Sequence, residues 1–129
     1  MRVLIVDDSS MVRRVVERSL RKSGMDVAEV IDAADGVEAL AVLRQCEEQG
    51  APLNLILTDI CMPAMDGFEF VEQMRAENLM PGVPVVIVTS EHCMSDVRRA
   101  MAAGVSAYIR KPFTAEQVKA TVLRLTQAA

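Results

Sequence analysis

Short runs of apolar residues alternate along the chain with longer stretches in which apolar residues recur every three or four positions. A short apolar run is typical of a buried strand, and the longer recurrence is typical of an amphipathic helix. The runs predict strands at Arg2–Val6, Asp26–Val30, Asn54–Thr58, Val83–Val88 and Ser106–Ile109. The stretches between and after them predict helices at Ser10–Lys22, Asp35–Glu48, Phe68–Asn78, Ser95–Ala103 and Thr114–Gln127.

Two of the predicted helices carry more specific local signals. The second is expected to turn Val37, Leu40 and Leu43 toward the core, because these residues recur at helical spacing. The last begins at Thr114 and has Gln117 three residues later, which is the spacing of a capping box. In a capping box, each side chain accepts a hydrogen bond from the backbone N–H of the other residue.

The elements follow one another as strand then helix, five times over. This alternation favours a doubly wound α/β fold, in which a five-stranded parallel sheet is covered by helices on both faces. The chain has 129 residues, of which 51% are hydrophobic and 25% are charged, so it can form a globular domain with a proper core. Since no linker, repeat or low-complexity segment interrupts it, we expect a single domain over residues 1–129.

Polar side chains follow four of the five predicted strands. They are Asp7 and Asp8, Asp59, Thr89 and Ser90, and Lys111 with Pro112. A single residue of this kind is commonly a helix cap or surface charge. Because the carboxyl ends of parallel strands meet at one edge of a sheet, where ligands bind in open α/β folds, the joint pattern predicts one shared site.

The charges of this predicted site indicate its chemistry. Asp7 and Asp8 repel each other by ~3 kcal/mol at ~5 Å with an effective dielectric constant of ~20. The three aspartates sum to −3, Lys111 reduces this to −2, and a divalent cation would bring it to zero. Oxygen ligands suit Mg²⁺, with Mn²⁺ as a possible substitute. A carboxylate beside Mg²⁺ and a lysine can attack a phosphoryl group to form an aspartyl phosphate.

The overall composition argues against direct binding to nucleic acid. The net charge is −4, only 3% of the residues are aromatic, and there is no tryptophan. Such a chain is poorly suited to phosphate contacts or to base stacking. The local basic cluster is expected to be the solvated face of the first helix. Its members are Arg13, Arg14, Arg18, Arg21 and Lys22.

The sequence also bears on the compartment. No segment is long and apolar enough for membrane insertion or for the core of a signal peptide. The cysteines Cys46, Cys61 and Cys93 are odd in number and widely spaced, which predicts reduced thiols rather than a disulfide framework or a zinc site. We therefore expect a cytoplasmic protein.

The stretch DICMPAMDG, at residues 59–67, resembles the phosphorylation loop of the receiver domain of bacterial two-component response regulators. The likeness extends over essentially the whole chain and is greatest to the CheY-like, single-domain members of the family. The other residues that carry it are Asp7, Asp8, Thr89, Tyr108 and the sequence KPF at residues 111–113. The resemblance implies a flavodoxin-like (βα)5 fold with strand order 2-1-3-4-5.

The resemblance also implies a role for each residue of the acidic cluster. Asp59 would be the phosphoacceptor. Asp8 would bind the metal directly, whereas Asp7 would act through water. Cys61 would offer its backbone carbonyl to the metal, which leaves its side chain free to vary in the family.

The remaining roles implied by the resemblance concern activation. Lys111 would contact the phosphoryl oxygens, across a cis peptide bond to Pro112. Thr89 would donate a hydrogen bond to the phosphoryl group, and Tyr108 would move inward with it. The output would then be read from the fourth helix, fifth strand and fifth helix, at residues 95–127.

The resulting prediction is a phosphorylation-controlled signalling switch that catalyses only its own phosphorylation and dephosphorylation and is otherwise not an enzyme. The phosphoryl donor would be a sensor histidine kinase or a histidine phosphotransferase, and the downstream protein target is unknown. One alternative is a Mg²⁺-dependent phosphohydrolase with an aspartyl nucleophile, which needs DxDx[TV] after the first strand, where this chain has DDSSM. The others are a flavin-binding protein and a receiver fragment of a longer regulator with an effector domain.

Overall fold

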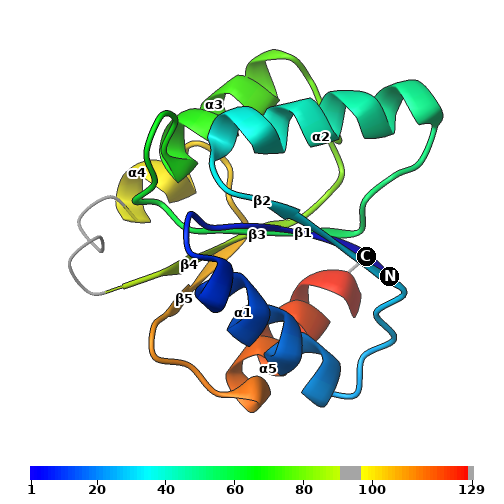
Figure 1. The fold of residues 1–129 in the computed structure, drawn as a ribbon, viewed down its shortest axis with the longest axis vertical. Coiled ribbons are helices and arrows are strands. Elements are labelled where there is room, and N and C mark those ends of the chain that lie inside the picture. The colour runs from blue at the N-terminus through cyan, green and yellow to red at the C-terminus, as the bar shows by residue number, and fades with distance from the viewer. Residues whose placement is uncertain (91–96, 128–129) are drawn as a thin grey trace.

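A five-stranded parallel sheet forms the centre of the computed structural model, which describes residues 1–90 and 97–127 (Figure 1). The strand order is β2-β1-β3-β4-β5, as the family resemblance implies. The strands are β1 (Arg2–Val6), β2 (Glu29–Ala33), β3 (Leu55–Thr58), β4 (Val85–Thr89) and β5 (Ala107–Arg110). The predicted doubly wound α/β fold is therefore confirmed.

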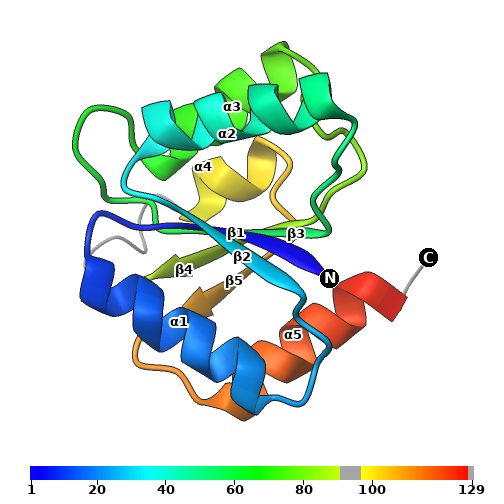
Figure 2. The ribbon, with the colours of Figure 1, turned by 45° about the vertical axis from the view of Figure 1, so that its right-hand side comes forward.

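Helices cover both faces of the sheet (Figures 1 and 2). One face carries α1 (Ser10–Lys22) and α5 (Ala115–Gln127). The other carries α2 (Gly36–Gln49), α3 (Gly67–Ala76) and α4 (Val97–Ala102). An apolar core lies on each side of the sheet, because successive residues of a central strand point to opposite faces.

Side-chain caps set the starts of two helices on the same face of the sheet. The Ser9 hydroxyl accepts a hydrogen bond from the Val12 backbone N–H at 3.2 Å and begins α1. At the start of α5, the Gln117 backbone N–H donates to the Thr114 hydroxyl at 3.1 Å, and the Thr114 backbone N–H donates to the Gln117 side chain at 2.8 Å. The predicted capping box is therefore present.

Strand β2 begins three residues later than predicted, at Glu29 instead of Asp26. Val27 is only 9% exposed and packs in the core beside α1, so its apolar character reports burial in a loop rather than in a strand. The backbone N–H of Ala28 donates to the carbonyl oxygen of Met1, just before the regular β1–β2 pairing starts. The alternating pattern identified a buried residue but not its backbone partner.

The core-facing side of α2 also differs from the prediction. Val37 is 53% exposed, whereas Gly36, Leu40 and Leu43 are buried. The helix approaches the 59–67 loop so closely at Gly36 that an added Cβ would lie 2.7 Å from Cγ of Met65. The buried face therefore starts at a glycine, which hydrophobic spacing cannot reveal.

The last strands are displaced by one or two residues from their predicted bounds. Strand β4 runs over Val85–Thr89, so Thr89 is its last residue instead of following it. Strand β5 likewise ends at Arg110, directly before Lys111. Helix α4 is described from Val97 to Ala102, and the first part of its predicted span, residues 95–96, lies outside the described residues.

Candidate functional site

Three carboxylates converge at the carboxyl ends of two neighbouring strands. Asp7 and Asp8 follow β1, and Asp59 follows β3, whose residue Thr58 lies opposite Val6 in the sheet. One carboxylate oxygen from each aspartate lies within 4.8 Å of the others. Asp7 and Asp59 are buried, at 4% and 8% exposed, whereas Asp8 is open to solvent. The predicted convergence of these residues is confirmed.

Lys111 follows the edge strand β5 and bridges two of these carboxylates. Its backbone N–H donates to the Thr89 carbonyl oxygen at 2.7 Å, which anchors it at the end of β4. Its ammonium Nζ lies 3.0 Å from Oδ2 of Asp7 and 3.3 Å from Oδ2 of Asp59. The peptide bond from Lys111 to Pro112 is cis, as the family resemblance implies.

The site holds more negative charge than its protein partners neutralise. Burial raises the pKa of Asp59 above its ordinary value, and the charge of Asp7 adds to this, although Lys111 opposes both. Burial alone would lower the pKa of the Lys111 ammonium, but its contacts with Asp7 and Asp59 outweigh burial and raise it. One lysine cannot balance three carboxylates, so the cluster favours a divalent cation.

The backbone around Asp59 is closely packed. The Asp59 N–H donates to the carbonyl oxygen of Val6 at 2.9 Å, and the Ile60 N–H donates to Oδ1 of Asp59 at 2.7 Å. Gly67 donates its backbone N–H to the Ile60 carbonyl oxygen at 2.8 Å. A Cβ at Gly67 would lie only 2.1 Å from the Asp59 carbonyl oxygen, so the loop closes only with glycine there. The sequence contained this residue in DICMPAMDG without revealing its role.

The predicted switch residues lie on the neighbouring strands β4 and β5. Thr89 is fully buried, and among the described residues its hydroxyl has no hydrogen-bond partner. Tyr108, on β5, lies opposite Ile87 of β4 and is 46% exposed. Ser90 directly follows β4 and is partly exposed. The structure thus places a buried hydroxyl without an acceptor beside a strand that carries an exposed aromatic ring.

The cysteines differ from the prediction of reduced thiols. Cys46 is a buried free thiol in α2, but Cys61 is disulfide-bonded. Cys61 lies exposed in the loop after β3, where a thiol is accessible to a bonding partner. Cys93 lies outside the described residues. The prediction is therefore wrong for Cys61, because spacing along the chain does not report which side chains meet.

Arg13 is a site residue that sequence reasoning missed. It was grouped with the solvated basic residues of α1, yet its side chain is only 16% exposed. Its guanidinium Nη1 donates to the backbone carbonyl oxygen of Asp7 at 2.5 Å, and its Nε lies 3.8 Å from Oδ2 of Asp32. Arg13 lies one turn after the Ser9 cap, and this position is the sequence signal that could have indicated that its side chain points back toward Asp7.

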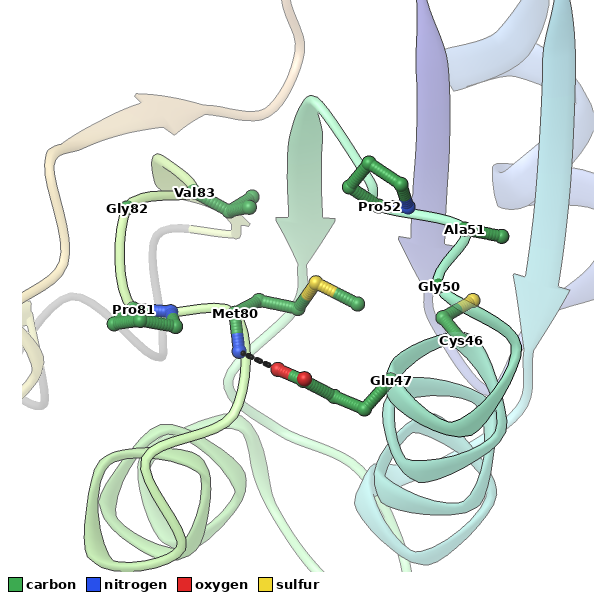
Figure 3. A pocket seen from close by; sticks show the side chains of 9 residues that line it. All are labelled: Cys46, Glu47, Gly50, Ala51, Pro52, Met80, Pro81, Gly82 and Val83. Carbon is green, nitrogen blue, oxygen red and sulfur yellow. Dashed lines mark hydrogen bonds between the residues drawn. The ribbon is translucent and has the colours of Figure 1, made fainter.

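A separate cavity of about 320 Å³ lies at the opposite end of the sheet (Figure 3). It is lined by the end of α2 and by the loops at residues 50–52 and 80–83. In it, the Met80 backbone N–H donates to Oε1 of Glu47 at 2.8 Å. Neither the three aspartates nor Lys111 lines this cavity, so it is distinct from the acidic cluster.

Comparison with known families decides what kind of domain carries this cluster. A model of the response regulator receiver domain matches residues 3–123. The chain belongs to this family. A chemotaxis protein CheY homolog from Campylobacter jejuni is 40% identical over 92% of this chain and 87% of its own length. Chemotaxis protein CheY1 from Helicobacter pylori strain J99 is 37% identical, over 92% of this chain and 91% of its own length.

Solved receiver structures agree with this assignment. Chemotaxis protein CheY4 from Vibrio cholerae is 35% identical, with a TM-score of 0.77 over 96% of this chain and 97% of that one. The receiver domain of a sensor histidine kinase from Pseudomonas aeruginosa is 28% identical, with a TM-score of 0.77 over 98% and 97%. That structure has a magnesium ion coordinated in its active site cleft.

The chain is therefore a CheY-like receiver domain of a response regulator. Receiver domains are phosphorylation switches in signalling rather than conventional metabolic enzymes, and they work with histidine kinases or phosphotransferases. In the part of the chain that the structure describes, no helix is both long enough and apolar enough to cross a membrane.

Proposed function

We propose that Asp59 accepts a phosphoryl group from a phosphohistidine of a sensor histidine kinase or a histidine phosphotransferase, with Mg²⁺ bound beside it. The observation that carries this proposal is the meeting of three carboxylates within 4.8 Å, two of them bridged by the Lys111 ammonium. Asp59 is the buried member that both Lys111 and the backbone of Ile60 contact. This arrangement suits a nucleophile that must stay oriented and shielded from water.

The residues present fit a hard divalent cation. Asp7, Asp8 and Asp59 supply carboxylate oxygens, and the backbone carbonyl of Cys61 would add a fourth oxygen. All-oxygen donors suit Mg²⁺, and Mn²⁺ accepts the same set. When bound, the ion would neutralise charge on the transferring phosphoryl oxygens. The magnesium ion in the related Pseudomonas receiver domain supports this assignment.

The transfer itself requires little further machinery from the chain. An Asp59 carboxylate oxygen attacks phosphorus, the bond from phosphorus to the donor imidazole nitrogen breaks, and the electron pair stays with the imidazole. The Lys111 ammonium and the Thr89 hydroxyl then donate hydrogen bonds to the phosphoryl oxygens. Hydrolysis by water reverses the switch, so the domain catalyses only its own phosphorylation and dephosphorylation.

The signal would leave through the face formed by residues 95–127. The Thr89 hydroxyl lacks an acceptor among the described residues, and a phosphoryl oxygen on Asp59 would supply one. Movement of Thr89 toward Asp59 would free space behind it for the Tyr108 ring. The target is a protein whose contacts differ between the two positions of the ring. The names of the relatives, which are chemotaxis proteins, support chemotaxis as the setting.

Intact-mass spectrometry tests the phosphoacceptor directly. Acetyl phosphate with Mg²⁺ should add one phosphoryl group to the wild-type chain, and hydroxylamine should remove it as it removes an acyl phosphate. Asp59→Asn should show no adduct, whereas the matched control Asp66→Asn, at the cap of α3, should keep it. An unchanged adduct on Asp59→Asn would move the acceptor to another residue.

Intrinsic fluorescence tests the proposed movement of Tyr108, because the chain has a single tyrosine and no tryptophan. Beryllofluoride with Mg²⁺ mimics the phosphoryl group on Asp59. It should protect Tyr108 from the quencher acrylamide, since the ring is 46% exposed without it. Equal quenching in both states would exclude this route of signal transmission, and Asp59→Asn should show no protection.

A further inference from the structure

Arg13 is held apart from the other basic residues of α1. Arg14 and Arg18 are exposed, whereas the Arg13 side chain is 16% exposed and turns back toward the end of β1. It lies one turn beyond Ser9, whose carbonyl oxygen accepts the Arg13 backbone N–H at 3.0 Å. The first turn of α1 therefore directs this guanidinium at the acidic loop.

The guanidinium contacts the peptide group that joins the two adjacent aspartates. Its Nη1 donates to the Asp7 carbonyl oxygen, so the Asp7–Asp8 peptide plane is held from one side. The Asp7 backbone N–H is already bound to the Ala33 carbonyl oxygen at 3.1 Å, and the Ser9 N–H donates to Oδ1 of Asp7 at 2.9 Å. With Arg13 in place, the backbone of Asp7 is held at both its N–H and its carbonyl.

Asp8 depends on this peptide for its own position. Its side chain is exposed, and no hydrogen bond from the described residues holds its carboxylate. The Asp7–Asp8 peptide plane therefore restricts where the Cα–Cβ bond of Asp8 starts, and the carboxylate rotates from there. A contact that fixes that plane holds Asp8 within reach of a cation bound by Asp7 and Asp59.

Asp32 allows the positively charged Arg13 to lie close to a cation site. Its Oδ2 lies 3.8 Å from Nε of Arg13, a buried atom that has no hydrogen-bond partner among the described residues. The Asp32 carboxylate offsets the guanidinium charge, which would otherwise disfavour a divalent cation nearby. At Asp7, Arg13 contacts the backbone carbonyl oxygen and not the carboxylate, so it does not compete for the ligand oxygens as Lys111 does.

We propose, building on the magnesium site of the proposed function, that Arg13 is a positioning residue: held by Asp32, it fixes the Asp7–Asp8 peptide so that the acidic pair is arranged to receive a divalent cation. Arg13 itself touches neither the metal nor the phosphoryl group. Its loss should weaken Mg²⁺ binding by roughly 10-fold, as is typical when a residue that orients a metal ligand is removed.

The sign of the effect separates positioning from simple electrostatics. Removal of a positive charge near three carboxylates should by itself tighten Mg²⁺ binding. Positioning predicts the opposite, namely weaker binding in Arg13→Ala. Arg14→Ala is the matched control, because it removes the same charge from the next position of the same helix without a contact to Asp7. It should leave Mg²⁺ affinity unchanged or slightly higher.

The experiment is a calorimetric titration of Mg²⁺ into wild type, Arg13→Ala, Arg13→Gln and Arg14→Ala at constant ionic strength. Arg13→Gln keeps a hydrogen-bond donor without the charge and should recover part of the affinity; it also serves if Arg13→Ala does not fold. Phosphorylation by acetyl phosphate should be slow in Arg13→Ala at low Mg²⁺ and should return to the wild-type rate at saturating Mg²⁺.

The outcomes distinguish this proposal from the function on which it depends. If wild type binds no Mg²⁺, the magnesium site itself fails. If wild type binds Mg²⁺ and both Arg13 variants bind it equally well or more tightly, the site stands and the positioning role of Arg13 is wrong. A lower melting temperature in EDTA with unchanged Mg²⁺ affinity would likewise assign Arg13 a purely structural role.

Discussion

The two ends of the sheet use carboxylates in opposite ways. At the carboxyl end, Asp7 and Asp59 are buried beside a single lysine, and their charge is left in excess. At the amino end, Glu47 lines the cavity of about 320 Å³ and accepts the backbone N–H of Met80. The carboxyl end therefore has uncompensated negative charge that favours a bound cation, whereas the carboxylate at the amino end holds a loop in place.

The difference teaches that a hollow surface and a reactive site need not coincide. The cavity at the amino end has little charge, and its carboxylate already has a partner. Met80 adopts a left-handed backbone with φ of 45°, which is unfavourable for a side chain of its kind, and Glu47 supports it there. Chemistry concentrates instead at the carboxyl end, because parallel strands bring their following residues together at that edge.

The largest expected effect separates the two ends by metal dependence. Asp8→Ala should slow phosphorylation by acetyl phosphate on the order of 100-fold or more and remove most of the rise in melting temperature caused by Mg²⁺. Asp8 is exposed, so the fold should survive. Glu47→Ala, at the other end, should retain both responses. Equal Mg²⁺ stabilisation of wild type and Asp8→Ala would contradict the assignment of Asp8 to the metal site.

The next largest effect is expected at the amino end of the sheet, on the stability of the fold. Glu47→Ala should lower the free energy of unfolding by about 1–2 kcal/mol, because it removes the acceptor of the Met80 N–H. Urea denaturation measures this, with Glu48→Ala as the exposed neighbouring control. If the two variants are equally stable, Glu47 does not support the loop, and the structural role assigned to the carboxylate at the amino end is wrong.

A smaller effect of opposite sign is expected at Thr89. Thr89→Val should raise the free energy of unfolding in EDTA by about 1 kcal/mol, since it removes a buried hydroxyl that lacks a partner among the described residues. The same variant should lose part of the stabilisation by beryllofluoride. Loss of stability in EDTA would show that the Thr89 hydroxyl already has a partner in the unphosphorylated state.

The smallest effect is a pH dependence confined to the carboxyl end. The pKa of Asp59 is raised, so the folded state binds a proton more tightly than the unfolded state does. Without metal, stability should therefore fall as pH rises from the ordinary aspartate value of 3.8 through the raised pKa. Asp59→Asn should flatten this slope in EDTA, measured by urea denaturation at several pH values. A slope that persists in the variant would assign it to another group.

The exposed ion pair Arg44–Glu77 also makes stability depend on pH, but its effect can be separated from that of Asp59. The side-chain hydrogen bond from Arg44 lowers the pKa of Glu77 to about 2. A depressed carboxylate pKa contributes stability that is present above its ordinary value of 4.5 and is lost as pH falls toward 2. The contribution of Glu77 is therefore constant above pH 4.5, and below pH 4.5 it changes with pH in the direction opposite to that of Asp59, so the sign of the slope distinguishes the two groups.

Much of the fold and site could be predicted from local pattern. Alternating strands and helices implied the parallel sheet, and Asp7, Asp8, Asp59 and Lys111 were expected to meet because their strands end at one edge. The capping box at Thr114 also followed from spacing alone. These features depend on periodicity and on backbone geometry, both of which are written in short stretches of sequence.

Other features required contacts between distant parts of the chain. The bounds of β2 depend on pairing with β1, and the buried face of α2 depends on the approach of Met65 to Gly36. Gly67 is required by the Asp59 carbonyl oxygen that it nearly touches. Nothing in the spacing of the cysteines showed that Cys61 would be disulfide-bonded.

The sequence by itself determined a receiver fold and the aspartates of its acidic edge. Only the tertiary structure decided that Arg13 turns inward to the Asp7 carbonyl oxygen while Arg14 stays in solvent. The two arginines are adjacent and chemically identical, so no local pattern separates them. The rotation of about 100° per residue along a helix, together with the acidic loop and Asp32 on one side of α1, gives them different surroundings.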